Sequence, residues 1–261
     1  MPRYALRLAY DGSAYRGWWP CGDGRAAGDA LAGALHRLGE TAVQPTACSR
    51  LDAGVHARAL VAHIDCARTW DPIALAEALN HQAPATLCCT ACAPVAADWD
   101  AITTCREKTY VYLLDVGRVR DPQRSRTHWR APRRPGLDAL RRASELIRQH
   151  DDFSALLRRG DHRRTLRTVI AALTWDQPDD GQLRCTLRAD RCGYRLVRSL
   201  VGLMVRHASG GCPLSTLAAL LAGQRLPQAA DQAPARGLYL WQAVHAPAPT
   251  WRPIAADFTW V

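Results

Sequence analysis

The residues with the clearest chemical potential lie in one stretch at 49–57, which reads Ser-Arg-Leu-Asp-Ala-Gly-Val-His-Ala. Its only carboxylate, Asp52, follows Arg50 by two positions and precedes the small pair at 53–54. Gly54 can adopt a conformation that a residue with a Cβ resists, so the chain can turn sharply and let a flat substrate approach Asp52. A nearby arginine would keep that carboxylate ionised. Taken alone, the stretch is more typical of a solvated turn that enters a strand.

Two stretches in order resemble one known family. The stretch at 49–57 resembles the Gly-Arg-Thr-Asp-Ala-Gly-Val-His signature of the tRNA pseudouridine synthase A family, with Ser and Leu in place of Gly and Thr. The stretch at 10–18 reads Tyr-Asp-Gly-Ser-Ala-Tyr-Arg-Gly-Trp and resembles the family's N-terminal Tyr-Asp-Gly-x-x-Tyr-x-Gly-Trp. The resemblance implies that Asp52 is the catalytic aspartate of a uridine isomerase. It also implies that Arg50 and His56 bind the substrate.

Residues 108–112 read Lys-Thr-Tyr-Val-Tyr and resemble the family's strand in which a tyrosine faces the target uracil. Tyr110 is the matching position. On a strand, Tyr110 and Tyr112 share a face, so an aromatic pair in the sheet core is an equally good interpretation of these residues alone. With the resemblance, we expect Tyr110 to stack on the base or handle a proton, and Tyr112 to pack.

The segment at 195–206 has a helical pattern and is otherwise apolar. Steps of three, four and four separate Arg195, Arg198, Gly202 and Arg206, which therefore share one side of the helix. Such a stripe is either a solvent face or a wall of an anionic site. The segment resembles the family's Met-Val-Arg-x-x-Val-Gly, which implies that Arg198 is the ion-pair partner of the catalytic aspartate. Residues 235–240 resemble the family's C-terminal strand and are expected to be structural.

The chain departs from the family pattern at several positions. Residues 99–102 read Trp-Asp-Ala-Ile where the family has Phe-His-Ala-Arg, and Leu60 stands in place of a usual Gln. Leu51 replaces the Thr beside the aspartate, and Gly28 replaces a Gln. These departures leave the aspartate, tyrosine and arginine in place, and they suggest a diverged member or an altered RNA substrate.

The composition favours a polyanionic partner. The chain has 261 residues, with 34 Lys+Arg against 24 Asp+Glu and a net charge of +10. A basic surface of this kind points first to nucleic acid. Arginines gather at 118–134 and again at 158–167, where Arg163 and Arg164 are expected to bind tRNA phosphates. Each arginine alone is more typical of a solvated loop.

No apolar run reaches the roughly 18 residues that a membrane helix needs, and no signal-peptide core follows the first residue. We therefore expect a cytoplasmic protein whose ten cysteines are reduced and mostly buried. Cys89 and Cys92 have a metal-like spacing, but on a strand they would face opposite sides, and no second Cys/His pair follows at zinc-finger spacing. No metal and no cofactor are expected.

Hydrophobic periodicity predicts a strand at 3–9, a helix from residue 29, a strand through Val43, a strand at 60–65, a helix that begins with Asp71 as cap and Pro72 in the first turn, and a strand at 86–95. This β-α-β-β-α-β order is the split βαβ, ferredoxin-like motif. The second half repeats this plan with a strand at 109–115, a helix at 137–149, strands at 166–175 and 183–189, helices at 196–208 and 214–221, and a strand at 238–244. We expect an α+β protein of two ferredoxin-like, RRM-like halves, residues 1–104 and 105–245, with a tail at 246–261. Their sheets are expected to join into one mixed, mainly antiparallel sheet flanked by helices, with the active cleft between the halves.

The predicted function is therefore isomerisation of uridine to pseudouridine in the anticodon stem-loop of tRNA by a homodimer, with Asp52, Tyr110 and Arg198 as catalytic residues. One alternative is a noncatalytic RNA-binding protein on the same scaffold, which would need the basic surface without Asp52. Another is a pseudouridine synthase that acts on a different RNA or on a small uridine substrate. A zinc-dependent RNA-modifying enzyme is a distant third.

Overall fold

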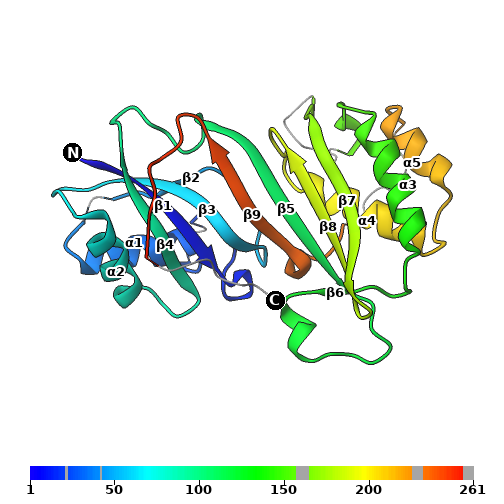
Figure 1. The fold of residues 1–261 in the computed structure, drawn as a ribbon, viewed down its shortest axis with the longest axis horizontal. Coiled ribbons are helices and arrows are strands. Elements are labelled where there is room, and N and C mark those ends of the chain that lie inside the picture. Colours follow the sequence, from blue (N-terminus) through cyan, green and yellow to red (C-terminus); the bar gives the residue numbers. More distant parts are fainter. Residues whose placement is uncertain (21–22, 42, 157–164, 225–231, 255–261) are drawn as a thin grey trace. The chain divides into compact units, whose positions relative to one another are not determined.

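The computed structural model describes the chain except for residues 21–22, 42, 157–164, 225–231 and 255–261. It divides the chain into two compact units, one made of residues 1–106 with 240–261 and the other of residues 107–239. In each unit, helices pack against a sheet (Figure 1). The domain boundaries expected from the sequence remain a proposal.

The first unit has the element order that the sequence predicts. Its elements are β1 (Arg3–Tyr10), α1 (Ala27–Arg37), β2 (Thr46–Ala47), β3 (His56–Asp65), α2 (Pro72–Gln82), β4 (Leu87–Val95) and β10 (Arg252–Pro253). β1 pairs antiparallel with β3 on one side and with β4 on the other, and β2 pairs antiparallel with β3. The resulting order β4-β1-β3-β2 is the split βαβ arrangement.

The central strand β1 is buried on both faces. Tyr4, Leu6 and Leu8 share one face of the strand, and Ala5 and Ala9 lie on the other, and all five are buried. These residues are buried because β1 has a hydrogen-bonded neighbour on each side and other side chains pack over it. β1 therefore forms the core from which the segment at 10–18 leaves the sheet.

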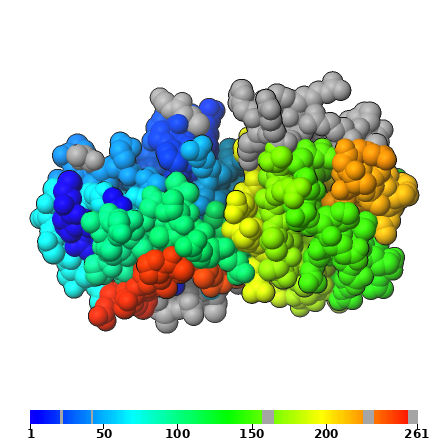
Figure 2. All heavy atoms as spheres, turned by 90° about the horizontal axis from the view of Figure 1, so that it is seen from above, coloured from blue at the N-terminus to red at the C-terminus, as the bar shows by residue number. Residues whose placement is uncertain are grey.

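The tail adds a short edge to the same sheet. β10 pairs antiparallel with β4, and the Arg7 guanidinium lies 5.7 Å from the centre of the Trp251 ring. Figure 2 shows this C-terminal segment, in red, lying against residues of the first unit in green. The described part of the tail thus packs on the first unit.

The start of α2 follows from its sequence. Asp71 has an extended backbone, and its carboxylate accepts hydrogen bonds from the amides of Ile73 and Ala74 at 3.0 Å each. Pro72 occupies the first turn, where its missing N–H costs nothing. The predicted cap and first-turn proline are confirmed. α2 packs against β4, and α1 lies beside α2 (Figure 1).

Two strands of this unit differ from the sequence prediction. β2 is only Thr46–Ala47, rather than a strand through Val43. β3 begins at His56, four residues before the predicted start, because its pairing with β1 continues as far as Tyr10 opposite Ala57. A register shift in that stretch breaks the alternation of buried and exposed residues, so the hydrophobic pattern does not reveal it.

The second unit contains three antiparallel strands in the order β5-β8-β7. Its elements are β5 (Cys105–Asp115) from its third residue on, β6 (Trp129–Arg130), α3 (Leu137–Arg148), β7 (Ile170–Asp179), β8 (Gln182–Ala189), α4 (Leu196–Ala208), α5 (Leu214–Leu221) and the first two residues of β9 (Leu238–His245), while the first two residues of β5 and the rest of β9 belong to the first unit. β6 pairs parallel with the end of β5. α3 packs on β7 and contacts α4 and α5 (Figure 1). The helices at α3, α4 and α5 confirm the sequence prediction to within one residue.

β7 begins at Ile170 instead of Leu166 because the intervening amides bond elsewhere. Phe153 donates its amide to the Leu166 carbonyl at 2.8 Å, and Thr168 donates its amide to the Asp151 carbonyl at 2.9 Å. The residues before Ile170 are therefore tied to the segment that follows α3. They are extended without belonging to the sheet.

Together these elements confirm the predicted class, α+β with mainly antiparallel strands flanked by helices. Within the residues that the structure describes, no helix is long and apolar enough to cross a membrane.

Candidate active site

Asp52 lies in a tight turn between β2 and β3. The Val55 amide donates to the Asp52 carbonyl at 3.1 Å, and Gly54 has φ +79°, which a residue with a Cβ rarely adopts. The Asp52 side chain is half-buried, and Leu51 before it is buried. The turn predicted from Ala53-Gly54 is present, and it leaves the carboxylate partly accessible.

The segment at 10–18 holds this loop by backbone contact. The Trp18 amide donates to the Leu51 carbonyl at 3.1 Å, and the Gly54 amide donates to the Tyr15 carbonyl at 3.3 Å. A Cβ on Gly12 would lie 2.1 Å from the Val55 oxygen, and one on Gly17 would lie 2.7 Å from the Leu51 oxygen. Both positions therefore require glycine, because the two backbones approach each other closely there. The stretches at 10–18 and 49–57 pack directly against each other.

Trp18 anchors the far end of that segment. Its side chain is buried and stacks on Tyr10 with ring centres 6.4 Å apart. The Gly28 amide donates to the Trp18 carbonyl at 3.0 Å, and a Cβ on Gly28 would lie 2.6 Å from that oxygen. The departure from the family's Gln at this position thus has a packing reason, because only glycine fits against the Trp18 backbone.

His56 is buried at the end of the aspartate loop, where β3 begins. Its ring is 2% exposed, and Nδ1 accepts the Gly12 amide at 3.1 Å. Asp11 Oδ1 lies 3.3 Å from the same Nδ1. The imidazole nitrogen thus lies between the Gly12 amide and the Asp11 carboxylate. These contacts assign His56 to positioning the loop, and its contact with substrate remains a prediction.

Arg50 contacts an aromatic side chain beside the loop. Its guanidinium lies 4.9 Å from the centre of the Trp19 ring, a cation–π contact at an exposed position. Its expected role in binding the substrate stays a prediction. Arg50 and Trp19 form an exposed basic and aromatic pair beside the loop, a combination suited to stacking on a base and contacting a phosphate.

Tyr110 lies on β5 opposite Leu187 and is 4% exposed. Tyr112, on the same face of β5, donates its hydroxyl to the Pro234 carbonyl at 2.7 Å and packs edge-to-face on Trp129. A Cβ on Gly237 would lie 2.7 Å from the Tyr112 ring. Tyr112 is thus a packing residue, as expected, whereas the role of Tyr110 stays a prediction.

Arg198 is the only half-buried residue among the first ten of α4, the other nine being buried. Its Nε donates to the Ala233 carbonyl at 2.8 Å, and the Ala233 amide donates back to the Arg198 carbonyl at 3.0 Å. Burial raises the pKa of Tyr112, and the positive charge of Arg198 opposes that shift. Arg198 therefore lies near the Tyr112 face of the second unit.

The arginine run at 118–134 divides into two groups. Arg124 is paired with Asp179 at 3.1 Å, and Arg130 is paired with Asp115 at 2.8 Å, so both are engaged in holding the loop. The other five are exposed: Arg118, Arg120, Arg126, Arg133 and Arg134. Arg163 and Arg164 lie outside the described residues.

The departure at 99–102 builds a structural connector. Trp99 is buried and donates Nε1 to the Pro247 carbonyl at 3.0 Å, and Asp100 accepts from the amides of Ile102 and Thr103. The Ala101 amide donates to Nδ1 of His63, whose pKa is lowered by burial. These side chains are committed to the fold of the first unit.

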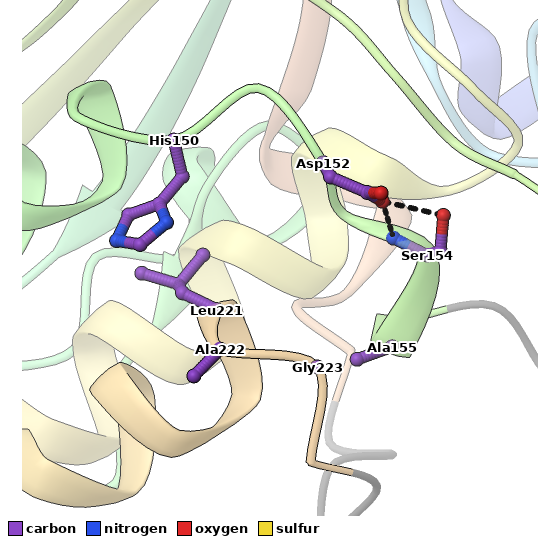
Figure 3. A pocket seen from close by; sticks show the side chains of 7 residues that line it. All are labelled: His150, Asp152, Ser154, Ala155, Leu221, Ala222 and Gly223. Atoms are coloured by element: carbon purple, nitrogen blue, oxygen red, sulfur yellow. Dashed lines mark hydrogen bonds between the residues drawn. The ribbon is translucent and has the colours of Figure 1, made fainter.

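One pocket of the second unit was not predicted from the sequence. It has a volume of about 390 Å³ and lies between the segment after α3 and the end of α5 (Figure 3). Asp152 on its wall accepts hydrogen bonds from the amide and hydroxyl of Ser154, which lower the pKa of its carboxyl. This carboxylate caps a turn, and none of the expected catalytic residues lines the pocket.

The contact between Gly12 and the aspartate loop gives a testable prediction. Gly12→Ala would place a methyl group on the Val55 backbone, so we expect the free energy of unfolding to fall by about 1–3 kcal/mol or more. Gly33→Ala on α1 is the control, because its Cβ would meet nothing closer than 3.6 Å and alanine favours helix by about 0.5–1 kcal/mol. Urea unfolding measures both, and an unchanged Gly12→Ala would contradict this packing.

Comparison with known proteins identifies relatives over nearly the whole chain. A family model described as tRNA pseudouridine synthase matches residues 145–245. The tRNA pseudouridine synthase A of Paracoccus denitrificans is 34% identical over 248 residues, covering 92% of this chain and 95% of that protein. That of Dinoroseobacter shibae is 33% identical and covers 97% and 100%, and that of Myxococcus xanthus is 30% identical and covers 95% and 94%.

Relatives of this similarity extend across both units, and they span the glycine segment, the aspartate loop, β5 and α4. The resemblance expected from the short motifs is therefore confirmed along the chain. The chain belongs to the tRNA pseudouridine synthase A family.

Proposed function

We propose that this chain isomerises uridine to pseudouridine in the anticodon stem-loop of tRNA, with Asp52 as the nucleophile or base. Membership of the family supports the enzyme class, an isomerase that acts on tRNA. The observation that most supports Asp52 is its place in a half-buried loop clamped between the glycine segment and β3. The stem-loop position rests on the resemblance of the motifs.

The reaction places clear demands on the site. The target uridine must leave its base stack to meet a protein carboxylate, and the N-glycosidic bond then breaks with Asp52 acting as nucleophile or base. The detached uracil rotates and rebonds to the sugar through carbon. The same two fragments are rejoined, so the reaction needs no external oxidant or reductant. A rigid loop suits this task, because the carboxylate must stay in place while the base turns.

Tyr110 and Arg198 are proposed to serve the same reaction. Tyr110 lies two residues before Tyr112 on β5. Because Tyr112 is held by its hydrogen bond to Pro234 and its contact with Gly237, the position of Tyr110 is well defined. Arg198 is fixed through its Nε and its carbonyl to Ala233. Both residues have the rigid support that a catalytic group requires. Arg198 supplies a positive charge, which would favour an ionised carboxylate in an enclosed site.

The exposed arginines are proposed to bind the tRNA backbone. Arg118, Arg120, Arg133 and Arg134 extend from a loop that is pinned by the Arg124 and Arg130 ion pairs, and Arg163 and Arg164 would add a second contact. A pinned loop with outward-facing arginines loses less entropy on binding than a free one. Arg50 and Trp19 would contact the nucleotides beside the target.

We further propose that the protein works as a homodimer in the cytoplasm. Light scattering of the purified chain measures the first part, and a mass of one chain at micromolar concentration would contradict it. The cytoplasmic location follows from the proposed substrate, which is processed there, and cell fractionation would test it.

Asp52→Asn is the central test of this proposal. The amide keeps the size and much of the hydrogen bonding of the carboxylate but cannot attack or accept a proton. We expect a folded protein that binds tRNA with unchanged affinity and forms pseudouridine at least about 10⁴-fold more slowly. Asp98→Asn, an exposed carboxylate of the same unit, should retain the parental rate.

Nucleoside analysis with positional mapping provides the readout for both variants. New pseudouridine outside the anticodon stem-loop would contradict the proposed position alone. Parental turnover by Asp52→Asn would contradict its catalytic role, and tRNA binding without any turnover by the parental protein would favour the noncatalytic alternative.

Tyr110→Phe tests the hydroxyl without removing the ring. We expect RNA binding to persist and turnover to fall by about 10²–10⁴-fold if the hydroxyl handles a proton. Tyr112→Phe is the matched control, because it removes the bond to Pro234 and should lower the free energy of unfolding by about 1–3 kcal/mol while leaving turnover near parental. Equal turnover in both variants would assign Tyr110 to packing.

Salt dependence tests the arginine loop. If Arg118 and Arg120 each neutralise a phosphate, replacing both with alanine should reduce the log–log slope of tRNA affinity against salt by about 1.4–1.8. The control replaces Arg141 and Arg142, exposed on α3, and should leave the slope unchanged. If the first pair also leaves it unchanged, this loop does not bind the tRNA backbone.

A further inference from the structure

Three side chains that are distant in sequence meet in the first unit. Cys48 follows β2, Cys105 begins β5, and His245 ends β9. One potential ligand atom from each residue lies within 4.8 Å of the other two. Cys48 is 3% exposed, His245 is 5% exposed and Cys105 is half-buried. Two sulfurs and an imidazole nitrogen, largely shielded from water, are a characteristic donor set for zinc.

The spacing is close to that of a bound ion. Zinc binds thiolate at about 2.3 Å and imidazole nitrogen at about 2.0–2.1 Å, so ligand atoms of a tetrahedral site lie roughly 3.4–3.8 Å apart. The present separations are no larger than 4.8 Å, so they exceed the separations of a zinc site by about 1.0–1.4 Å at most. Binding of an ion therefore requires the three ligand atoms to move toward a shared centre by about this amount.

The tautomer of His245 suits metal binding. Its Nε2 lies 3.2 Å from the Ala101 carbonyl, which can only accept, so Nε2 carries the proton and Nδ1 keeps its lone pair. A ligand histidine usually donates its other N–H to a carbonyl or carboxylate in this way. Trp99 packs on the imidazole with ring centres 5.2 Å apart and limits its rotation.

The backbone around the cluster is also held in place. The Ala246 amide donates to the Thr104 carbonyl at 3.0 Å, which keeps the neighbours of His245 and Cys105 together. The Cys48 amide donates to the Val61 carbonyl of β3 at 2.8 Å. Three separate segments therefore present their ligands from fixed main-chain positions, as a preorganised site requires.

A buried hydroxyl of the same unit has no protein partner. The Tyr10 hydroxyl, at the end of β1, is buried and has no hydrogen-bond partner among the described residues. A buried hydroxyl without a protein partner is expected to meet water or another bound group.

We propose that Cys48, Cys105 and His245 bind one zinc ion, with water in the fourth position. The ion would tie the entry of the aspartate loop to the start of β5 and the end of β9, because Cys48 is only four residues before Asp52. Its role is to fix the position of that loop. The sequence contains no local metal motif at these residues, because Cys48 and Cys105 are 57 positions apart and Cys105 and His245 are 140 positions apart.

Cobalt provides a direct probe, because tetrahedral Co²⁺ bound to thiolate gives a near-ultraviolet charge-transfer band and intense visible bands. The reduced full-length protein is stripped with a chelator and titrated with Co²⁺ and then with Zn²⁺. We expect saturation at about one equivalent per chain, the bands of thiolate ligation, and their loss when Zn²⁺ displaces Co²⁺. A featureless spectrum or no binding would overturn the proposal.

Variants assign the ligands. Cys48→Ser and Cys105→Ser should each weaken Co²⁺ binding by at least about 100-fold and reduce the charge-transfer intensity, with circular dichroism confirming the fold. Cys89→Ser and Cys92→Ser, buried in β4, are matched controls and should bind as the parent does. Loss of binding in the controls with retention in Cys48→Ser would place the metal elsewhere. A Cys48–Cys105 disulfide in the protein purified from the cell under thiol-alkylating conditions, detected by mass spectrometry, would also overturn the proposal.

Discussion

The feature on which the active loop depends is the backbone contact between the glycine segment at 12–17 and the aspartate turn. Two carbonyl oxygens of the turn occupy the space where side chains of the segment would otherwise begin. Two amide hydrogen bonds, from Trp18 and Gly54, tie the same strands of backbone together. Asp52 is therefore mounted on a loop whose path is dictated by main-chain contact rather than by its own side chain.

The surrounding first unit extends this constraint. β1 is the central strand of its sheet, and the glycine segment leaves directly from its end at Tyr10. β3 begins at His56, whose imidazole accepts the Gly12 amide, so the strand after the loop is also tied to the segment before it. The carboxylate is thus held from both sides by elements of the same sheet. The proposed zinc site would add a third restraint, on the stretch that enters the loop.

Much of the fold could be predicted from local pattern. The helices of the second unit have clear apolar periodicity, and α2 has an Asp-Pro start, so both their existence and their limits followed from the sequence. The limits of β3 and β7 did not, since they depend on pairing with distant strands and on amides that bond outside the sheet. Local residue patterns contain no information about such long-range pairing.

The site itself was predictable in part. Asp52, Tyr110 and Arg198 were identified by resemblance, and the tight turn at Gly54 followed from residue type. The placement of Arg50 over Trp19 was not foreseen, because no local pattern indicates that two residues 31 positions apart lie together. Gly28 illustrates the reverse case. It stood out as a departure from the family, and its reason became visible only from the Trp18 carbonyl against it.

Family membership and the clamped loop together form the central claim, that this chain is a tRNA uridine isomerase. The most direct measurement is quantitative nucleoside analysis of an unmodified tRNA transcript after incubation with the purified parental protein. The account predicts that pseudouridine accumulates with an equal loss of uridine and with no other nucleoside changed. The account is contradicted if the protein binds the transcript but the uridine content of the transcript stays constant, even when the protein and the RNA are present at equal concentrations.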